Sequence, residues 1–476
     1  MLQYTLKRLL LTIPTFFFIS LLLFLVLNIA PGRPGAAAGG GDGERGNQEQ
    51  KESYRIFKEQ FNLDKPILLN TRFALEQSEV RELLVTGFNL EGDPSAAQRI
   101  EAQDNLEDYG NYLVRHLVPL LDDADPGVRQ VTADTLTVAT QMRFVNERRG
   151  DVKAAREKNR GISKQNTAVK QWRWDDDATE AQQAEVIASW KSWYADNEGA
   201  YTYTGKEKTW AFFLDTRFAK YWSNLMHLDF GVSTADRRPV FETVLSKLKY
   251  SLSLTFTSVI LAYAISVPIG VFSAIRQGTK IDAAVTVVLF IMYSLPTFFT
   301  GTVLLRLLTE GEPVSWFPTG DFQTMTSDPM TTWALLKDIL WHLVLPIATY
   351  TSVSLATLSR YARAGVIEVI RADYIRTARA KGLSEPVVII KHAVRNGMIP
   401  ILTLLGGLLP ALVAGSVVIE VVFNIPGMGQ YIFQSINLRD YNAVMAVLLT
   451  SSFLALIGIL ISDLSYAFVD PRISFD

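Results

Sequence analysis

The chain has 476 residues, of which 49% are hydrophobic and 20% are charged, and its formal net charge is −2. This balance argues against a disordered chain, and it argues against a nucleic-acid-binding protein because such proteins are usually clearly basic. The absence of cysteine excludes disulfides, thiolate metal sites and cysteine nucleophiles.

The charges are unevenly distributed along the chain. Residues 71–215 carry 18 basic and 25 acidic side chains, about twice the charge density of the remaining positions. This pattern predicts a soluble domain set into a membrane protein. The predicted division is a first transmembrane helix in 1–34, a linker and a further segment in 35–70, the soluble insert in 71–215, and a transmembrane domain in 216–476.

The first apolar segment, 9–30, is uncharged throughout. Lys7 and Arg8 precede it, so a secretory signal peptide is the alternative to a membrane span. The segment is longer than a usual signal core, and further apolar segments follow, which favours a permanent span.

The insert is predicted to be helical. Residues 113–138 have apolar side chains at helical spacing, interrupted around Asp125 and Pro126, which predicts a helical hairpin that resembles a HEAT-type repeat. One clear unit is visible, whereas a solenoid needs about three. Five of the nine tryptophans fall within 172–210 and predict an aromatic core. Residues 145–170 are basic with few apolar side chains and predict a mobile loop.

A six-residue sequence recurs at the two edges of the insert. Residues 69–74 read Leu-Asn-Thr-Arg-Phe-Ala and residues 214–219 read Leu-Asp-Thr-Arg-Phe-Ala. A duplicated junction would explain the recurrence, and coincidence is the alternative.

Five further segments are apolar and long enough to cross a bilayer core, which takes about 20 helical residues. Together with the first segment they predict an all-α integral membrane protein with six transmembrane helices. The five segments are 252–272, 283–305, 339–358, 398–423 and 443–468.

The lysine and arginine distribution predicts the orientation. Residues 360–398 hold eight basic and three acidic residues, whereas 310–338 hold one lysine and five acidic residues. Both termini and the loop 360–398 are therefore predicted to be cytoplasmic, and the insert extracytoplasmic. Basic residues before 252 oppose this assignment, but long translocated loops are largely exempt from the rule.

Three polar residues within the predicted spans, His342, Glu420 and Asp463, are candidates for a role in a transport pathway, because a charge in lipid is costly. The favoured interpretation is that all three reach water from the ends of their spans.

The sequence contains no catalytic or nucleotide-binding pattern. The four histidines form no metal-binding spacing, and Gly205-Lys206 is followed by Glu207 rather than by the serine or threonine of a phosphate-binding loop. Energy for transport would therefore come from another subunit.

The loop after residue 370 predicts two short helices joined near Gly382. The first, over 373–381, has an apolar stripe within a basic surround. Such a helix could bind anionic lipid headgroups or dock into a groove of a cytoplasmic partner, and periodicity leaves both open.

Asp373-Tyr374, Arg376-Thr377-Ala378 and Lys381-Gly382-Leu383 follow one another in this loop. In this order they resemble the "EAA" loop of ABC importer permeases, and most closely that of the first permease subunit in the dipeptide/oligopeptide/nickel family. Arg376-Thr377-Ala378 takes the place of the Glu-Ala-Ala of the general motif. The likeness extends, in order, to Leu63-Asp64-Lys65-Pro66, Asp229-Phe230-Gly231, Ser294-Leu295-Pro296, Glu420-Val421-Val422-Phe423 and Pro426-Gly427-Met428-Gly429.

The resemblance implies six transmembrane helices of the ABC type I importer kind and transport by alternating access. It implies a bacterial inner-membrane protein without a cofactor of its own, since ATP and Mg would be bound by partner subunits. The implied partners are a second ABC permease, two ATP-binding subunits, a periplasmic or lipid-anchored substrate-binding protein and membrane lipid, with no nucleic acid. The implied ATPase-coupling residues are Asp373, Tyr374, Arg376, Thr377, Ala378, Lys381, Gly382 and Leu383.

One alternative function is a membrane-anchored scaffold that acts through its helical insert. Within the importer interpretation, the insert is hypothesised to supplement docking of the substrate-binding protein or to sense the state of the cell envelope.

Overall fold

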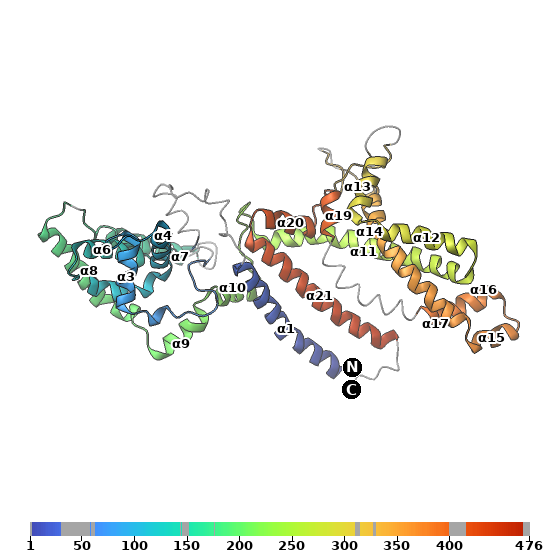
Figure 1. Ribbon diagram of the computed structural model, residues 1–476, viewed down its shortest axis with the longest axis horizontal. Coiled ribbons are helices and arrows are strands. Elements are labelled where there is room, and N and C mark those ends of the chain that lie inside the picture. The colour runs from blue at the N-terminus through green and yellow to red at the C-terminus, as the bar shows by residue number, and fades with distance from the viewer. Residues whose placement is uncertain are drawn as a thin grey trace. The chain divides into compact units, whose positions relative to one another are not determined.

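The computed structural model is helical, apart from loops and one isolated bridge between Val232 and Pro239, in all the residues it describes. These residues are 2–29, 58, 62–142, 144, 152–175, 177–309, 315–326, 330–398 and 416–469 (Figure 1). The chain divides into two compact units: unit 1 comprises Met1–Gly41 and Leu228–Asp476, and unit 2 comprises Asp42–His227. The predicted boundaries of the insert at 71 and 215 stay a prediction.

Four of the six predicted spans coincide with helices that are long and apolar enough to cross a membrane. They lie in α1 (Leu2–Ile29), α11 (Val240–Ile275), α14 (Thr332–Ile370) and α21 (Tyr441–Val469). The chain is therefore an all-helical protein with several candidate membrane spans.

The segment 283–305 is not the single straight span predicted from the sequence. It forms α12 (Lys280–Ser294) and α13 (Thr297–Leu308), which meet at an angle of 100°. Pro296 cannot donate the hydrogen bond that would continue the helix, and it disfavours a helical conformation at Leu295, whose ψ is 126°. Counted as one bent span, this pair brings the described candidates to five.

Most of the fifth predicted span, 398–423, lies outside the described residues. The described part ends in the short helix α19 (Val417–Val422), which a tight turn connects to α20 (Met428–Asn437).

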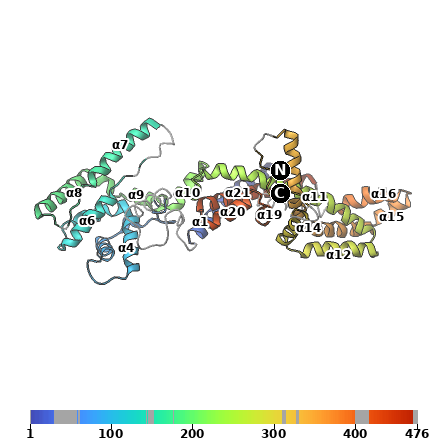
Figure 2. The ribbon, with the colours of Figure 1, turned by 90° about the horizontal axis from the view of Figure 1, so that it is seen from above.

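Helices α11 and α14 form the centre of unit 1 (Figure 2). Gly270 permits their close approach, since a Cβ atom at this position would lie 2.5 Å from the carbonyl oxygen of Ser359. Helix α1 runs alongside α21 (Figure 1), where the Phe16 and Phe453 rings meet edge to face at 5.7 Å.

Unit 2 has its own apolar core, built from buried side chains that include Leu84, Leu117, Leu136 and Trp190. Its helical elements are η1 (Arg72–Ala74), α3 (Gln77–Phe88), α4 (Ala96–Tyr109), η2 (Gly110–Tyr112), α5 (Val114–Leu120), α6 (Pro126–Ala139), α7 (Val152–Val169), α8 (Glu180–Tyr201), α9 (Gly205–Leu214) and α10 (Arg217–Met226).

The predicted helical hairpin is confirmed by α5 and α6, which pack together. The Asp125 side chain caps α6 by accepting a hydrogen bond from the Gly127 backbone nitrogen at 2.7 Å, and Pro126 occupies the first turn. The likeness to HEAT-type repeats stays a prediction.

The predicted mobile loop over 145–170 was wrong for its larger part, because α7 covers Val152–Val169. Its buried side chains, Ala155, Ile162 and Val169, recur every seven residues and form a narrow inward stripe. Most of the remaining positions are polar, so the composition of the segment does not indicate a helix.

The predicted aromatic core is confirmed in part. Trp190 is fully buried and its ring contacts those of Trp172 and Trp193 at centroid distances of 5.1 and 5.6 Å. Trp210, however, is exposed on α9.

The two copies of the recurring edge sequence lie side by side in unit 2. Asn70 Nδ2 donates to the main-chain oxygen of Asp215 at 3.1 Å. The matching arginines, Arg72 and Arg217, each donate to a main-chain oxygen of the segment 63–66, at 2.7 and 2.6 Å. The ends of the predicted insert are therefore adjacent, as is usual for a domain inserted into a loop.

We expect Asp215→Asn to reduce the stability of unit 2 by about 1–3 kcal/mol at pH 7, because it weakens a part-buried hydrogen-bond cluster. The Asp215 carboxylate accepts hydrogen bonds from Tyr112 Oη at 2.8 Å and from Lys65 Nζ at 3.1 Å. Burial alone would raise the pKa of Asp215, but Lys65 and Tyr112 outweigh burial and hold this pKa below its usual value.

The sign of the pH dependence follows from this lowered pKa. The contribution of Asp215 is complete above the unfolded-state pKa of about 3.9 and is lost as pH falls through the lower folded-state pKa. Thermal unfolding followed by tryptophan fluorescence should show that the stabilities of the wild type and the variant converge at acidic pH. A stability difference that does not depend on pH would contradict this role of the Asp215 carboxylate. Asp122→Asn, which removes an exposed ion pair with Lys191, is the control and should cost less than about 1 kcal/mol.

Candidate coupling site

Helix α14 leads directly into the loop that carries the predicted coupling residues. After α14 ends at Ile370, α15 (Asp373–Ala380) begins with Asp373 in its first turn, where a negative charge is favourable. Gly382 follows α15 with a φ of +78°, a left-handed conformation that glycine adopts without strain. The prediction of a short helix that ends near Gly382 is confirmed.

The loop then turns back through a second helical segment. It consists of α16 (Glu385–Val387), the π-helical stretch η3 (Val388–Val394) and α17 (Arg395–Gly397). The two arms pack together around a small apolar cluster, in which Ile375 and Ala378 of α15 contact Val388 and Ala393.

This cluster shows that the apolar stripe on α15 packs within the loop rather than against another molecule. Docking would place the stripe in a groove of a partner, but two of its residues, Ile375 and Ala378, are buried against the second arm of the loop itself. The surface available to a partner is therefore mainly polar, with one aromatic and one apolar side chain. The predicted coupling residues that remain exposed are Asp373, Tyr374, Arg376, Thr377, Lys381, Gly382 and Leu383.

Two polar contacts on this surface fix the loop. Tyr374 Oη accepts a hydrogen bond from Asn396 Nδ2 at 2.9 Å, so the exposed tyrosine ring is held in one position. Arg379 donates twice to the Glu385 carboxylate, at 2.7 and 3.1 Å, across the turn at Gly382. Hydrogen bonding to Arg379 lowers the pKa of the Glu385 carboxyl group.

The second arm of the loop is attached to α14 by two glycines. A Cβ atom on Gly365 would collide with the carbonyl oxygen of Gly397, and a Cβ atom on Gly397 would lie 3.0 Å from the carbonyl oxygen of Gly365. Such backbone contact leaves no room for any side chain, so the loop and α14 form one packed body.

An ion pair ties the same part of α14 to the helices before it. Arg363 on α14 donates to both oxygens of Asp282 on α12, at 3.1 and 2.9 Å. Ser273 of α11 and the backbone nitrogen of Gly278 also donate to this buried carboxylate. The Asp282 carboxylate thus accepts four hydrogen bonds, from α11, from α14 and from the turn before α12, so its hydrogen-bonding capacity is well satisfied. No local sequence pattern predicts this contact.

A second buried carboxylate, Glu420 on α19, contacts α11 in the first half of that helix, at Ser251. Its side chain is 0% exposed, which contradicts the expectation that it reaches water. Ser251 Oγ of α11 donates to it at 2.7 Å, and the backbone nitrogen of Gln430, in the first turn of α20, donates at 2.9 Å. Gly427 is required beside it, because a Cβ atom there would lie 2.5 Å from the carboxylate.

The other two polar candidates do not join this site. His342 is also buried rather than exposed to water, and its Nδ1 lies 2.8 Å from the carbonyl oxygen of Asp338 on the same helix. The side chain of Asp463 lies outside the described residues. Within the described parts of the chain, histidine, aspartate and glutamate form no group that could hold a metal ion.

Comparison with known proteins identifies the family. Residues 266–475 match the family model described as "Binding-protein-dependent transport system inner membrane component". The chain is 38% identical over 260 residues to the oligopeptide transport system permease protein AppB of Bacillus subtilis (strain 168), which covers 54% of this chain and 80% of AppB.

Other relatives show similar coverage. The dipeptide transport system permease protein DppB of Escherichia coli (strain K12) is 34% identical over 272 residues, which are 54% of this chain and 80% of DppB. The glutathione transport system permease protein GsiC of Escherichia coli (strain K12) is 33% identical over 259 residues, which are 54% of this chain and 79% of GsiC. These matches exclude the alternative of a membrane anchor that serves only to display the insert. The chain therefore belongs to the inner-membrane permeases of binding-protein-dependent ABC importers and is a non-catalytic, multi-pass permease subunit of such a transporter.

Proposed function

We propose that this permease imports peptides and that α15 with the following turn transmits ATP-driven movement into its membrane helices. The names of the relatives AppB and DppB support oligopeptide or dipeptide cargo. The main support for the coupling role is the close attachment of the 373–397 loop to α14, because displacement of α15 by an ATPase would move α14 with it.

Two buried carboxylates extend this body along the membrane helices. Asp282 joins α11 and α12 to α14 next to the loop, and Glu420 joins α11 to α19 and α20. Movement at α15 would therefore reach α11 at two points, near Ser273 and near Ser251. Such a packed group of helices is suited to the rigid-body motions of alternating access.

The proposed assembly contains a second permease, two ATPase subunits that bind ATP and Mg, and an extracytoplasmic substrate-binding protein. The basic loop 360–398 and both termini would face the cytoplasm, with unit 2 on the opposite side. The exposed side chains of Tyr374, Arg376, Thr377 and Lys381 would contact the ATPase, and Leu383 would contribute an apolar contact at the turn.

Gly382→Val tests the coupling role. Valine at a φ of +78° is strained by roughly 1–2 kcal/mol or more, which should reduce the population of the native turn about 5- to 30-fold. We expect peptide uptake and substrate-stimulated ATPase activity of the reconstituted importer to fall together. Gly92→Val places valine at a comparable φ of +76° in a loop of unit 2 and controls for general strain. Normal coupling in the Gly382 variant would refute the assignment.

A further inference from the structure

Unit 2 contains a cavity of about 1300 Å³, formed where α4, α6, α7 and α8 meet the 62–72 segment and the start of α10. This volume exceeds the 300–1,000 Å³ that is usual for sites of drug-sized ligands. The cavity is therefore large enough for a short extended polymer.

The inner wall is polar, but its charges compensate one another. Lys58 lies 2.6 Å from the Asp108 carboxylate, and Lys65 lies 3.1 Å from that of Asp215. The Tyr112 ring, which also lines the cavity, stacks on Tyr203 at a centroid distance of 5.1 Å. Tyr112 itself is buried, and its hydroxyl is engaged by Asp215 and Asn70, so the aromatic surface of the inner wall comes from the half-buried rings of Tyr109 and Tyr203.

The outer wall carries an excess of positive charge. Seven basic and five acidic side chains line the cavity. The exposed ones are the basic Lys158, Lys170, Arg173 and Lys220 and the acidic Glu107. The exposed basic side chains come from α7, from the segment between α7 and α8, and from α10. Because cations from three separate elements converge on one opening, the entrance favours a ligand with an anionic end.

We propose that this cavity binds a short peptide, with the free α-carboxylate held by the cations at the entrance and the amide groups and side chains placed against the tyrosine-lined inner wall. The choice of a peptide rests on the proposed function, whereas the preference for an anionic end rests on the cavity alone. The cavity wall includes Asp215 and Lys220, so a bound peptide would contact the segment that leads toward α11.

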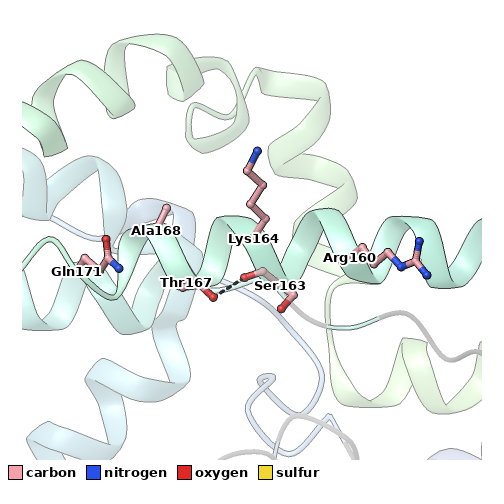
Figure 3. A pocket seen from close by; sticks show the side chains of 6 residues that line it. All are labelled: Arg160, Ser163, Lys164, Thr167, Ala168 and Gln171. Atoms are coloured by element: carbon pink, nitrogen blue, oxygen red, sulfur yellow. Dashed lines mark hydrogen bonds between the residues drawn. The ribbon is translucent and has the colours of Figure 1, made fainter.

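Fluorescence anisotropy on the purified full-length chain tests this site. The probes are tetra-alanine with an amino-terminal dye, the same peptide with a carboxyl-terminal amide, and inorganic phosphate as a competitor. The rim variant combines Lys158→Gln, Arg173→Gln and Lys220→Gln, all at exposed positions. Its control combines Arg160→Gln and Lys164→Gln, which lie on α7, the helix that also carries Lys158. Arg160 and Lys164 line a separate open groove of about 510 Å³, together with Ser163, Thr167 and Gln171 (Figure 3).

We expect the free-carboxylate peptide to bind the wild type, and both the amide and the rim variant to weaken binding about tenfold, as three exposed ion pairs would. The control variant should change affinity less than twofold. Equal affinities for the acid and the amide, an unchanged affinity in the rim variant, or rim-dependent binding of phosphate without peptide would each overturn the proposal.

The same variants distinguish a failure of the proposed peptide site from a failure of the proposed peptide-import function. Peptide uptake by the assembled importer together with no rim-dependent binding would refute the site and leave the proposed function intact. Rim-dependent peptide binding in an importer that transports no peptide would refute the proposed cargo and support the site.

Discussion

Gly365→Ala is expected to reduce substrate-coupled ATPase activity and uptake by about 5- to 150-fold. The added Cβ atom would collide with the carbonyl oxygen of Gly397, so α14 and the second arm of the loop must separate. Overpacking of this kind costs about 1–3 kcal/mol, and a coupling free energy of that size corresponds to this range of activity. The measurement is ATP hydrolysis by the reconstituted importer with and without loaded binding protein.

Gly161→Ala is the matched control, because Gly161 lies in helix α7 with nothing within 4 Å of an added Cβ atom. It should leave coupling unchanged and, if anything, favour the helix. Full coupling in the Gly365 variant would show that close contact between α14 and the loop is not required for transmission.

Glu420→Ala is expected to destabilise unit 1 by about 3 kcal/mol, because it removes a buried acceptor and leaves donors on two other helices unpaired. Those donors are the Ser251 hydroxyl and the backbone nitrogen of Gln430. Unfolding in mixed micelles should show the loss directly. Ser251→Ala should cost about 1–3 kcal/mol, because it removes this hydrogen bond and also the acceptor of the Met428 backbone nitrogen. The two effects should be less than additive, since both substitutions remove the hydrogen bond between Ser251 and Glu420.

Gly427→Ala provides an independent check of the same site. Its Cβ atom would lie 2.5 Å from the Glu420 carboxylate, so it should destabilise the wild type but be tolerated better in Glu420→Ala. Strictly additive effects of the Gly427 and Glu420 substitutions would contradict the proposed packing.

The membrane helices and the coupling turn were readable from the sequence because their signals are local. Long apolar runs predicted α1, α11, α14 and α21, and Gly382 marked the end of α15. The bend between α12 and α13 had a local signal as well, in Pro296, but proline occurs within intact spans such as α11 and α14 and does not by itself predict a break.

The contacts that join these helices were not readable, because their partners are distant in the chain. Ser251 and Glu420 are 169 positions apart, and Asp282 and Arg363 are 81 apart. A single sequence shows that each residue is polar near the end of an apolar run, which fits exposure to water as well as burial with a partner. Likewise, the stripe on α15 fits an internal partner and an external one equally well.

The most direct test of the central claim is site-specific crosslinking from α15 in the native membrane. The chain has no cysteine, so Thr377→Cys, at an exposed position on α15, gives one unique attachment point for a photoactivatable maleimide. Ser163→Cys, on the exposed surface of α7 in unit 2, is the control. Mass spectrometry should identify an ATPase subunit bound to the α15 probe and not to the control. Adducts of the α15 probe with lipid alone, in membranes where the importer is intact, would contradict the coupling role of this helix.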